Sequence, residues 1–178
     1  MIKTEITTVK TRVDSNDIIR DAVDKEKFIE YRQQWADATS LKKVTDFPIQ
    51  LDFELNYSCN FTCPMCTWNA ESTEGKGQAT WFDFEVFKEV LDDAMLKGLK
   101  AIRLNYINEP LIRKDITKFI EYARKVGILD IYFSTNGSLL TDDISRDLIK
   151  SRLFRLQISL DAYTKETFEK IRTGGNFD

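Results

Sequence analysis

Apolar and polar residues follow two distinct periods along the chain. Residues 49–56 place an apolar side chain at every second position, which is typical of a half-buried strand. Residues 84–95 place apolar side chains three and four positions apart, which is typical of an amphipathic helix. The two patterns together predict strands at 49–56, 101–107, 128–133 and 153–160, and helices that begin near residues 84, 116, 141 and 164.

The order of these elements predicts the fold class. A strand is followed by a helix in each of the repeated units, with Asp83 as the expected N-cap of the first of these helices. Gly98 and Gly127 are expected to end the first and second of them. Because alternating strands and helices form parallel sheets with right-handed crossovers, we expect an α/β domain with a parallel sheet.

A helical pattern also precedes the first strand. It begins near Ser15, and Asp24 either caps a second helix or marks a kink within one. Pro48 disfavours a helix immediately before the first strand. We expect an N-terminal helical extension over residues 1–46, packed on the outside of a main domain over 47–178; a partner-binding helix is the alternative. The pattern rests on Ile18, Ile19, Ala22, Val23, Phe28, Tyr31 and Trp35.

Composition narrows the classes of partner. The 178 residues are 42% hydrophobic and 31% charged, which is enough for one domain with a real core. The net charge of −3 gives no basic excess for nucleic acid or phospholipid, so we expect neither partner. The sequence has no apolar run of membrane-spanning length and no secretion signal at its start, so we expect a cytoplasmic protein without a membrane anchor.

All three cysteines lie in one short stretch, directly after the first predicted strand. Cys59, Cys63 and Cys66 have the spacing C-x3-C-x2-C, and the chain contains no histidine. Soft thiolate ligands favour zinc or an iron–sulfur cluster. Three ligands are one short of a closed zinc site, whereas a cubane cluster held by three thiolates keeps one iron open for chemistry. A zinc knuckle with a borrowed fourth ligand, or three core thiols, is the alternative.

Short polar motifs follow the other strands. Asn108 and Glu109 come after the second strand, and Ser134 and Asn136 after the third. The fourth strand ends in a segment that contains Ser159 and Asp161. Since ligands bind at the carboxyl ends of parallel strands, we expect these residues to meet the cysteines at one edge of the sheet.

The cysteine motif resembles the signature of radical S-adenosylmethionine enzymes. The resemblance implies a partial TIM barrel of (βα) units, of which about four are present here. It also implies that Cys59, Cys63 and Cys66 hold a [4Fe–4S] cluster whose open iron chelates S-adenosylmethionine. Met65 departs from the family, which more often has an aromatic residue before the third cysteine, although methionine is apolar enough to pack over a cluster.

The resemblance also assigns cofactor contacts. Asn108-Glu109-Pro110 resembles a Gly-Gly-Glu-Pro motif that binds the methionine amino group, but Ile107-Asn108 stands where two glycines are usual, so the match is to the Glu-Pro half. Ser134 or Asn136 would contribute to the nucleoside side of the pocket, and Ser159 and Asp161 would contact ribose or methionine. The alternatives are structural: Glu109 as a charge at a helix N-terminus, Asn136-Gly137 as a turn, and Asp161 as a helix cap.

The family chemistry implies particular partners. An electron donor such as flavodoxin or ferredoxin reduces the cluster, and a 5′-deoxyadenosyl radical then takes hydrogen from a peptide or sugar. Hydrogen-atom abstraction needs no general base, so we assign no catalytic side chain. The sequence style is similar to a branch with a SPASM-type C-terminal region and further clusters.

The resemblance covers about the first two-thirds of the family's catalytic domain, and the fourth strand would be an unpaired edge. We therefore expect a fragment or split protein, or a second chain or homodimer that completes the barrel. Two other readings remain: an iron–sulfur electron-transfer module without catalysis, and an accessory half-barrel that needs a partner.

Overall fold

The computed structural model describes residues 24–67 and 80–178. The chain divides into two compact units, Met1–Lys43 and Val44–Asp178, and each is described by itself. The first part of the expected N-terminal helix, with Ile18, Ile19, Ala22 and Val23, lies outside the described residues.

In the first unit, one helix is described. Helix α2 spans Lys25–Thr39, and the Asp24 side chain accepts a hydrogen bond from the Lys27 N–H over 3.1 Å. Asp24 has extended backbone angles, so it caps a helix rather than lying within a kinked one. Phe28 and Tyr31 are buried, and their rings meet edge to face at 5.5 Å.

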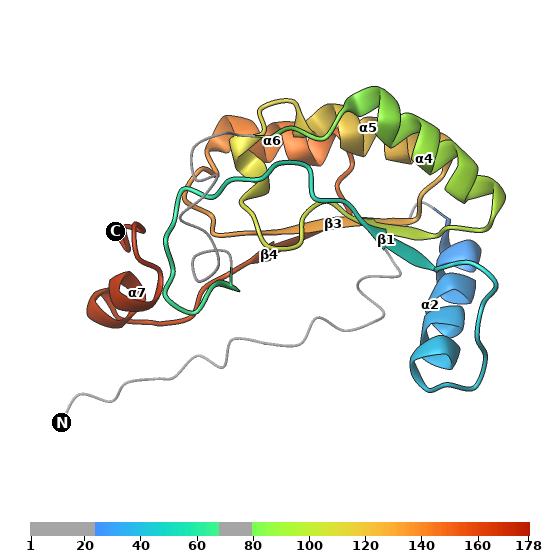
Figure 1. The fold of residues 1–178 in the computed structure, drawn as a ribbon, viewed down its shortest axis with the longest axis horizontal. Coiled ribbons are helices and arrows are strands. Elements are labelled where there is room, and N and C mark those ends of the chain that lie inside the picture. The colour runs from blue at the N-terminus through green and yellow to red at the C-terminus, as the bar shows by residue number, and fades with distance from the viewer. Residues whose placement is uncertain (1–23, 68–79) are drawn as a thin grey trace. The chain divides into compact units, whose positions relative to one another are not determined.

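The second unit contains a four-stranded sheet in which every neighbouring pair is parallel. Strands β1 (Gln50–Asp52), β2 (Ala101–Arg103), β3 (Asp130–Thr135) and β4 (Arg155–Ile158) lie side by side in chain order (Figure 1). The parallel α/β architecture expected from the sequence is therefore confirmed.

The strands are shorter than the alternating pattern predicts. In β1 the alternation continues to Asn56, but the ladder ends soon after Asp52, with a last hydrogen bond from the Phe53 N–H to the Arg103 carbonyl. The Glu54 carboxylate then accepts hydrogen bonds from the N–H groups of Tyr106 and Ile107 at 2.9 and 2.8 Å. The apolar–polar alternation thus continues into a loop that builds the site.

Helices α4 (Phe84–Leu96), α5 (Ile116–Val126) and α6 (Asp142–Lys150) lie together on one face of the sheet (Figure 1). The expected cap is confirmed, because the Asp83 carboxylate accepts hydrogen bonds from the N–H groups of Glu85 and Val86. Gly127 ends α5 in the left-handed conformation that glycine adopts readily. A short 3-10 helix, η1 (Pro110–Ile112), follows β2, and α7 (Lys165–Ile171) follows β4.

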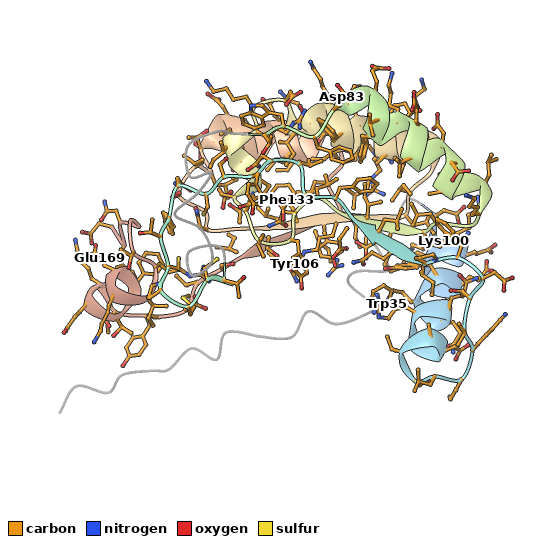
Figure 2. All side chains as sticks on the ribbon, in the orientation of Figure 1. Trp35, Asp83, Lys100, Tyr106, Phe133 and Glu169 are labelled. Atoms are coloured by element: carbon orange, nitrogen blue, oxygen red, sulfur yellow. The ribbon has the colours of Figure 1, made fainter. Side chains whose placement is uncertain are left out.

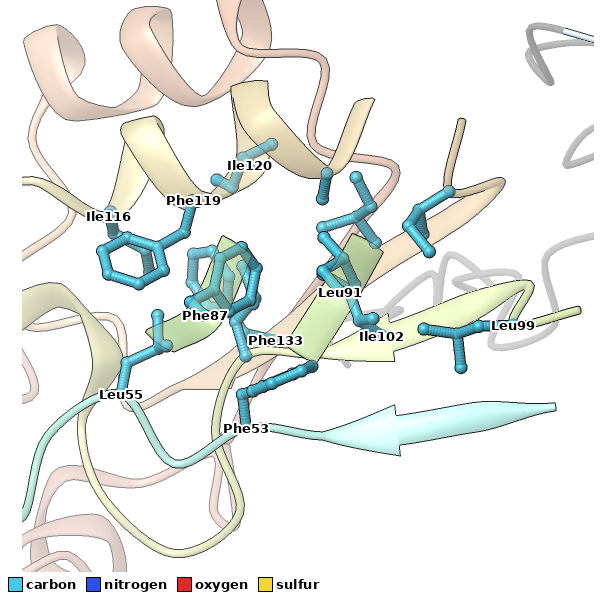
Figure 3. Close-up of a cluster of buried hydrophobic side chains, with 14 of the residues drawn as sticks. Phe53, Leu55, Phe87, Leu91, Leu99, Ile102, Ile116, Phe119, Ile120 and Phe133 are labelled. Atoms are coloured by element: carbon cyan, nitrogen blue, oxygen red, sulfur yellow. The ribbon is translucent and has the colours of Figure 1, made fainter. Parts of the chain in front are cut away.

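The hydrophobic core lies between these three helices and the sheet. The strand residues Ile102 and Phe133 point into it (Figure 3). Ile131 of β3 belongs to the same cluster, and all three side chains are fully buried. Phe87 packs edge to face on Phe119 with ring centres 4.9 Å apart. Phe53, directly after β1, packs edge to face on Phe87 with ring centres 4.8 Å apart, and this contact joins the sheet to α4.

The intervening strand residues form a polar face. Figure 2 shows Phe133 on the helix side of the sheet and Tyr106 on the opposite side. On that polar face Arg155 makes a two-pronged ion pair with Asp130, at 3.2 and 3.1 Å, and lies over the Tyr132 ring at 4.0 Å. Parallel sheets are usually apolar on both faces, so this polar face marks a surface built for something other than core packing.

Candidate functional site

A cavity of about 400 Å³ opens at the carboxyl ends of the strands. Loops that follow all four strands contribute to its walls, as parallel topology predicts. The lining includes Cys59, Cys63 and Cys66 after β1; Arg103, Asn105, Asn108 and Glu109 on or after β2; Ser134, Thr135 and Asn136 at the end of β3; Ser159 after β4; and Arg172 after α7.

No helix in the described part of the chain is long and apolar enough to cross a membrane.

The three cysteines, all in the described residues, line this one cavity and form no disulfide. Cys63 is buried, whereas Cys59 and Cys66 are partly exposed. A tight turn brings the motif together, because the Cys66 N–H donates to the Cys63 carbonyl over 3.0 Å. Met65, between them, also lines the cavity and is 53% exposed.

The surroundings of Cys59 favour its neutral thiol. Burial is the largest effect and raises the pKa of Cys59 above its ordinary value. The Phe61 N–H, which donates to Sγ over 3.5 Å, lowers the pKa, and the negative charge of Glu109 raises it again. A bound cation would have to displace the thiol proton, as metal binding to cysteine generally does.

The donor set fits an iron–sulfur cluster. Among residues 24–67 and 80–178, no group of three His, Cys, Asp or Glu side chains is close enough together to hold a single metal ion. The three thiols nevertheless share one cavity wall, and thiolates are the ligands that iron–sulfur clusters take. The three thiols are therefore better suited to a multi-atom cluster, in which each sulfur can bind a different iron, than to a single metal ion.

Glu109 joins three segments around the cavity. Its side chain is buried, and Oε1 accepts hydrogen bonds from the Thr135 hydroxyl at 2.7 Å and the Leu111 N–H at 3.1 Å. Oε2 accepts from the Asn136 N–H at 2.8 Å. Glu109 is thus the N-cap of η1, which agrees with the alternative of a charge at a helix N-terminus. It also lines the cavity.

Three buried asparagines connect the loops behind Glu109. Asn56 donates to the Glu109 carbonyl over 3.0 Å, and Asn108 donates back to the Asn56 carbonyl over 3.0 Å. Asn105 donates to the Asn108 carbonyl over 3.1 Å and accepts from the Ser134 N–H over 2.9 Å. Asn56 and Asn105 were not singled out from the sequence, because the apolar–polar pattern places both of them inside predicted strands.

Asn108 has one atom left over. Its Oδ1 is buried and has no hydrogen-bond partner among the described residues. Asn108 stands where the resemblance places a glycine, and its amide nitrogen is used to hold the Asn56 carbonyl. Asn108 lines the cavity, and its Oδ1 is a buried acceptor without a partner at a position where glycine offers none.

Ser134, Asn136 and Ser159 all line the cavity. The Ser134 hydroxyl donates to Gln157 on β4 over 2.9 Å. The Asn136 amide donates to Asn60 Oδ1 over 2.9 Å, which ties the end of β3 to the cysteine motif. Both side chains therefore have structural partners, and their proposed contacts to a cofactor stay predictions.

Asp161 lies differently from the other residues of the set. It is absent from the cavity lining in the described residues and pairs with Arg172, which does line the cavity, at 2.5 Å. The capping alternative is wrong, because the N-cap of α7 is Thr164. Arg172 was missed from the sequence, since its place follows from the return of the chain after α7.

Comparisons with known proteins identify a family. The model described as "Radical SAM superfamily" matches residues 53–178. Mycofactocin maturase MftC of Mycolicibacterium smegmatis is 31% identical over 137 residues, which are 75% of this chain and 32% of that protein. A GTP 3′,8-cyclase of Clostridium botulinum is 36% identical over 121 residues, which are 67% of this chain and 37% of that protein. The chain thus spans about a third of the length of these curated relatives.

Solved structures share the fold. SuiB of Streptococcus suis, bound to the precursor peptide SuiA, superposes with a TM-score of 0.60 at 15% identity, over 95% of this chain and 36% of that one. BtrN in complex with AdoMet and 2-DOIA gives a TM-score of 0.58 at 21% identity, over 72% and 52% of the two chains. At these identities the likeness concerns the fold alone.

Proposed function

The chain belongs to the radical SAM superfamily, as its cysteine motif predicts, and from this premise we propose that it binds a [4Fe–4S] cluster through Cys59, Cys63 and Cys66. Members of this family bind such a cluster together with S-adenosylmethionine. Bound together, these two groups supply reductive cleavage of a carbon–sulfur bond, which delivers a 5′-deoxyadenosyl radical for hydrogen-atom abstraction.

One observation carries the proposal. The three thiols of a chain without histidine line the same cavity as the polar loop ends of β2, β3 and β4. A structural zinc site would need a fourth nitrogen or sulfur ligand, and the chain contains no further cysteine and no histidine. A site with three thiolates and an adjoining polar cavity is suited to a cluster that also binds a small molecule.

The chain's own residues would orient that small molecule. We assign the methionine amino group to the part of the cavity wall that Asn108 and Glu109 line, because Asn108 has an unused amide oxygen and Glu109 a carboxylate. Ser134 and Asn136 would lie on the nucleoside side. Ser159 would contact ribose or methionine directly, and Asp161 would act through Arg172, its ion-pair partner.

For the substrate we favour a peptide over a carbohydrate. The support is the maturase among the relatives and the precursor peptide bound to SuiB. Residues 47–178 would carry the cofactors and residues 1–46 would be an extension, with flavodoxin or ferredoxin as the electron donor. Completion of the barrel by a further segment, a second chain or a second copy belongs to the same proposal.

Anaerobic reconstitution with iron and sulfide tests the proposal. The wild-type chain should take up about four iron and four sulfide. The Cys59→Ser, Cys63→Ser and Cys66→Ser variants should each lose most of this uptake, while Lys150→Ala, an exposed change on α6, should keep it. Two results would overturn the assignment: a purified chain that contains zinc, or cysteine variants that take up as much iron as the wild type.

A further inference from the structure

The segment that follows α7, residues 172–175, lies directly against the cysteine loop, residues 59–66. The Thr62 N–H donates a hydrogen bond to the Thr173 carbonyl over 2.8 Å. A Cβ atom at Gly174 would lie 3.4 Å from the Asn60 carbonyl oxygen, so the two backbones are almost in contact. More than a hundred residues of sequence separate these two backbones, so tertiary structure alone brings them together.

A small hydrophobic cluster joins the same two regions. Phe61 and Cys63 from the cysteine loop pack with Phe168 of α7, and all three are at least nine-tenths buried. Cys59, Cys66 and Ala162 are partly buried against them. This cluster is separate from the main core under α4, α5 and α6, and it packs the cysteine loop against α7.

Gly175 closes the fit between the segment and the loop. A Cβ atom there would lie 2.8 Å from Cζ of Phe61 and 2.9 Å from Cε1 of Phe168. Both rings are buried, so neither can move without disturbing its neighbours. The backbone angles of Gly175 are not the reason for glycine, because its φ is not in the left-handed region that Gly174 adopts.

Arg172 places a positive charge beside the middle cysteine. Its Nη1 lies 4.0 Å from Sγ of Cys63, and its Nη2 lies 2.5 Å from the Asp161 carboxylate. The Nε atom is buried and has no partner among the described residues. Asp161 therefore fixes the guanidinium in the cavity wall and leaves part of its hydrogen-bonding capacity unused.

We propose that residues 172–175 are a latch that holds the cysteine loop in its cluster-binding conformation, with Arg172 as a positioning residue beside Cys63. The role of the latch toward a cluster rests on the proposed function, whereas the latch itself is a property of the chain without a cluster. The loop has no regular secondary structure beyond a turn, so tertiary contacts must supply its order. Ligands that are already in place bind a metal group more tightly than ligands that must first be ordered.

Alkylation of the cluster-free chain tests the latch directly. In Gly175→Ala the added methyl group displaces the Phe61 ring, and iodoacetamide should label Cys63 several-fold faster than in the wild type. Thr173→Ala is the matched control, because it removes an exposed side chain and keeps the carbonyl that Thr62 contacts. Phe168→Ala removes the α7 side chain from the same hydrophobic cluster and should also speed the labelling of Cys63. Mass spectrometry identifies the labelled cysteine.

The readings of this experiment are separable. Circular dichroism and a cooperative unfolding transition show whether each variant is folded. If only one of Gly175→Ala and Phe168→Ala is folded, that variant alone is enough for the test. Labelling of Cys63 at the wild-type rate in a folded Gly175→Ala or Phe168→Ala chain would overturn the latch. If the wild-type chain takes up no cluster, the proposed function fails, and the labelling rates still decide the latch.

The reconstituted chain tests the part played by Arg172. A nearby cation favours the more negative, reduced form of a cluster, so Arg172→Gln should shift the midpoint potential to more negative values. Arg172→Lys should recover part of the shift, and Lys170→Gln, which removes an exposed charge from the last turn of α7, should behave as the wild type. A potential in Arg172→Gln equal to that of Lys170→Gln would show that the charge beside Cys63 has no such effect.

Discussion

The Thr135 hydroxyl donates a hydrogen bond to Oε1 of Glu109 over 2.7 Å, and both side chains are buried. This contact joins the end of β3 to the loop after β2. Because Glu109 also accepts from the Asn136 and Leu111 N–H groups, its position decides the shape of one cavity wall. Glu109 is therefore a structural centre of the site as well as a candidate for contact with the cofactor.

Removal of this hydrogen bond should be measurable. Thr135→Val should lower the free energy of unfolding by about 1–2 kcal/mol, because a buried acceptor loses its donor. Glu109→Gln should cost more, about 2–3 kcal/mol, because an amide NH2 must then face backbone N–H donors. Urea unfolding provides the values, and Thr167→Val, which replaces an exposed hydroxyl within α7, should change little. Equal effects at the buried and exposed positions would contradict this account.

Asn108 offers a second test, at the position where the family has glycine. Asn108→Gly removes the hydrogen bond to the Asn56 carbonyl and adds backbone freedom. We expect the free energy of unfolding to fall by about 1–3 kcal/mol. Isothermal titration of the reconstituted chain with S-adenosylmethionine should show weaker binding in Asn108→Gly if Oδ1 faces the ligand, and unchanged binding would remove Asn108 from the ligand contacts.

The aromatic core should dominate stability. Phe87 is fully buried between Phe53 and Phe119, at 4.8 and 4.9 Å between ring centres. Phe87→Ala should lower the free energy of unfolding by about 3–5 kcal/mol, through lost burial and the cavity left behind. Ile149→Ala, on an exposed side chain of α6, should stay within about 0.5 kcal/mol of the wild type. Similar losses in both variants would show that the core is packed differently.

The contact between α4 and α5 should depend on pH. The Tyr122 phenol donates to the Asp92 carboxylate at 2.7 and 2.8 Å, and this hydrogen bond is the main cause that raises the pKa of Tyr122 above its ordinary value. The protonated phenol is favoured in the folded state, so its contribution is complete below about pH 10 and is lost as pH rises through the raised pKa. Unfolding measured across this range should show a steeper loss in the wild type than in Tyr122→Phe.

Much of the fold follows from local patterns. The spacing of apolar residues predicts α4 and α5 almost to their ends, because the Asp83 cap and Gly127 are local signals. Parallel topology also predicts that the cysteines and Glu109 line one cavity. In contrast, the predicted ends of β1 and β2 were wrong. The residues that follow these strands form loops at the site and do not extend the strand ladder.

The buried polar network could not be predicted in the same way. Asn56 and Asn105 form hydrogen bonds with partners on other loops, and no local pattern indicates which carbonyl each one reaches. The contact of Arg172 with Asp161 and Cys63 depends on the turn after α7, which brings distant residues together. Sequence thus indicates which loops meet, and the structure shows how their side chains join.

The central claim is that three thiolates hold a cluster with one iron open to S-adenosylmethionine. Electron paramagnetic resonance of the anaerobically reconstituted, reduced chain tests it most directly, with spectra recorded before and after the addition of S-adenosylmethionine. We predict a [4Fe–4S]⁺ signal whose g values shift on addition, because the ligand binds the iron that has no cysteine. A cluster signal that stays unchanged at saturating S-adenosylmethionine would contradict the claim.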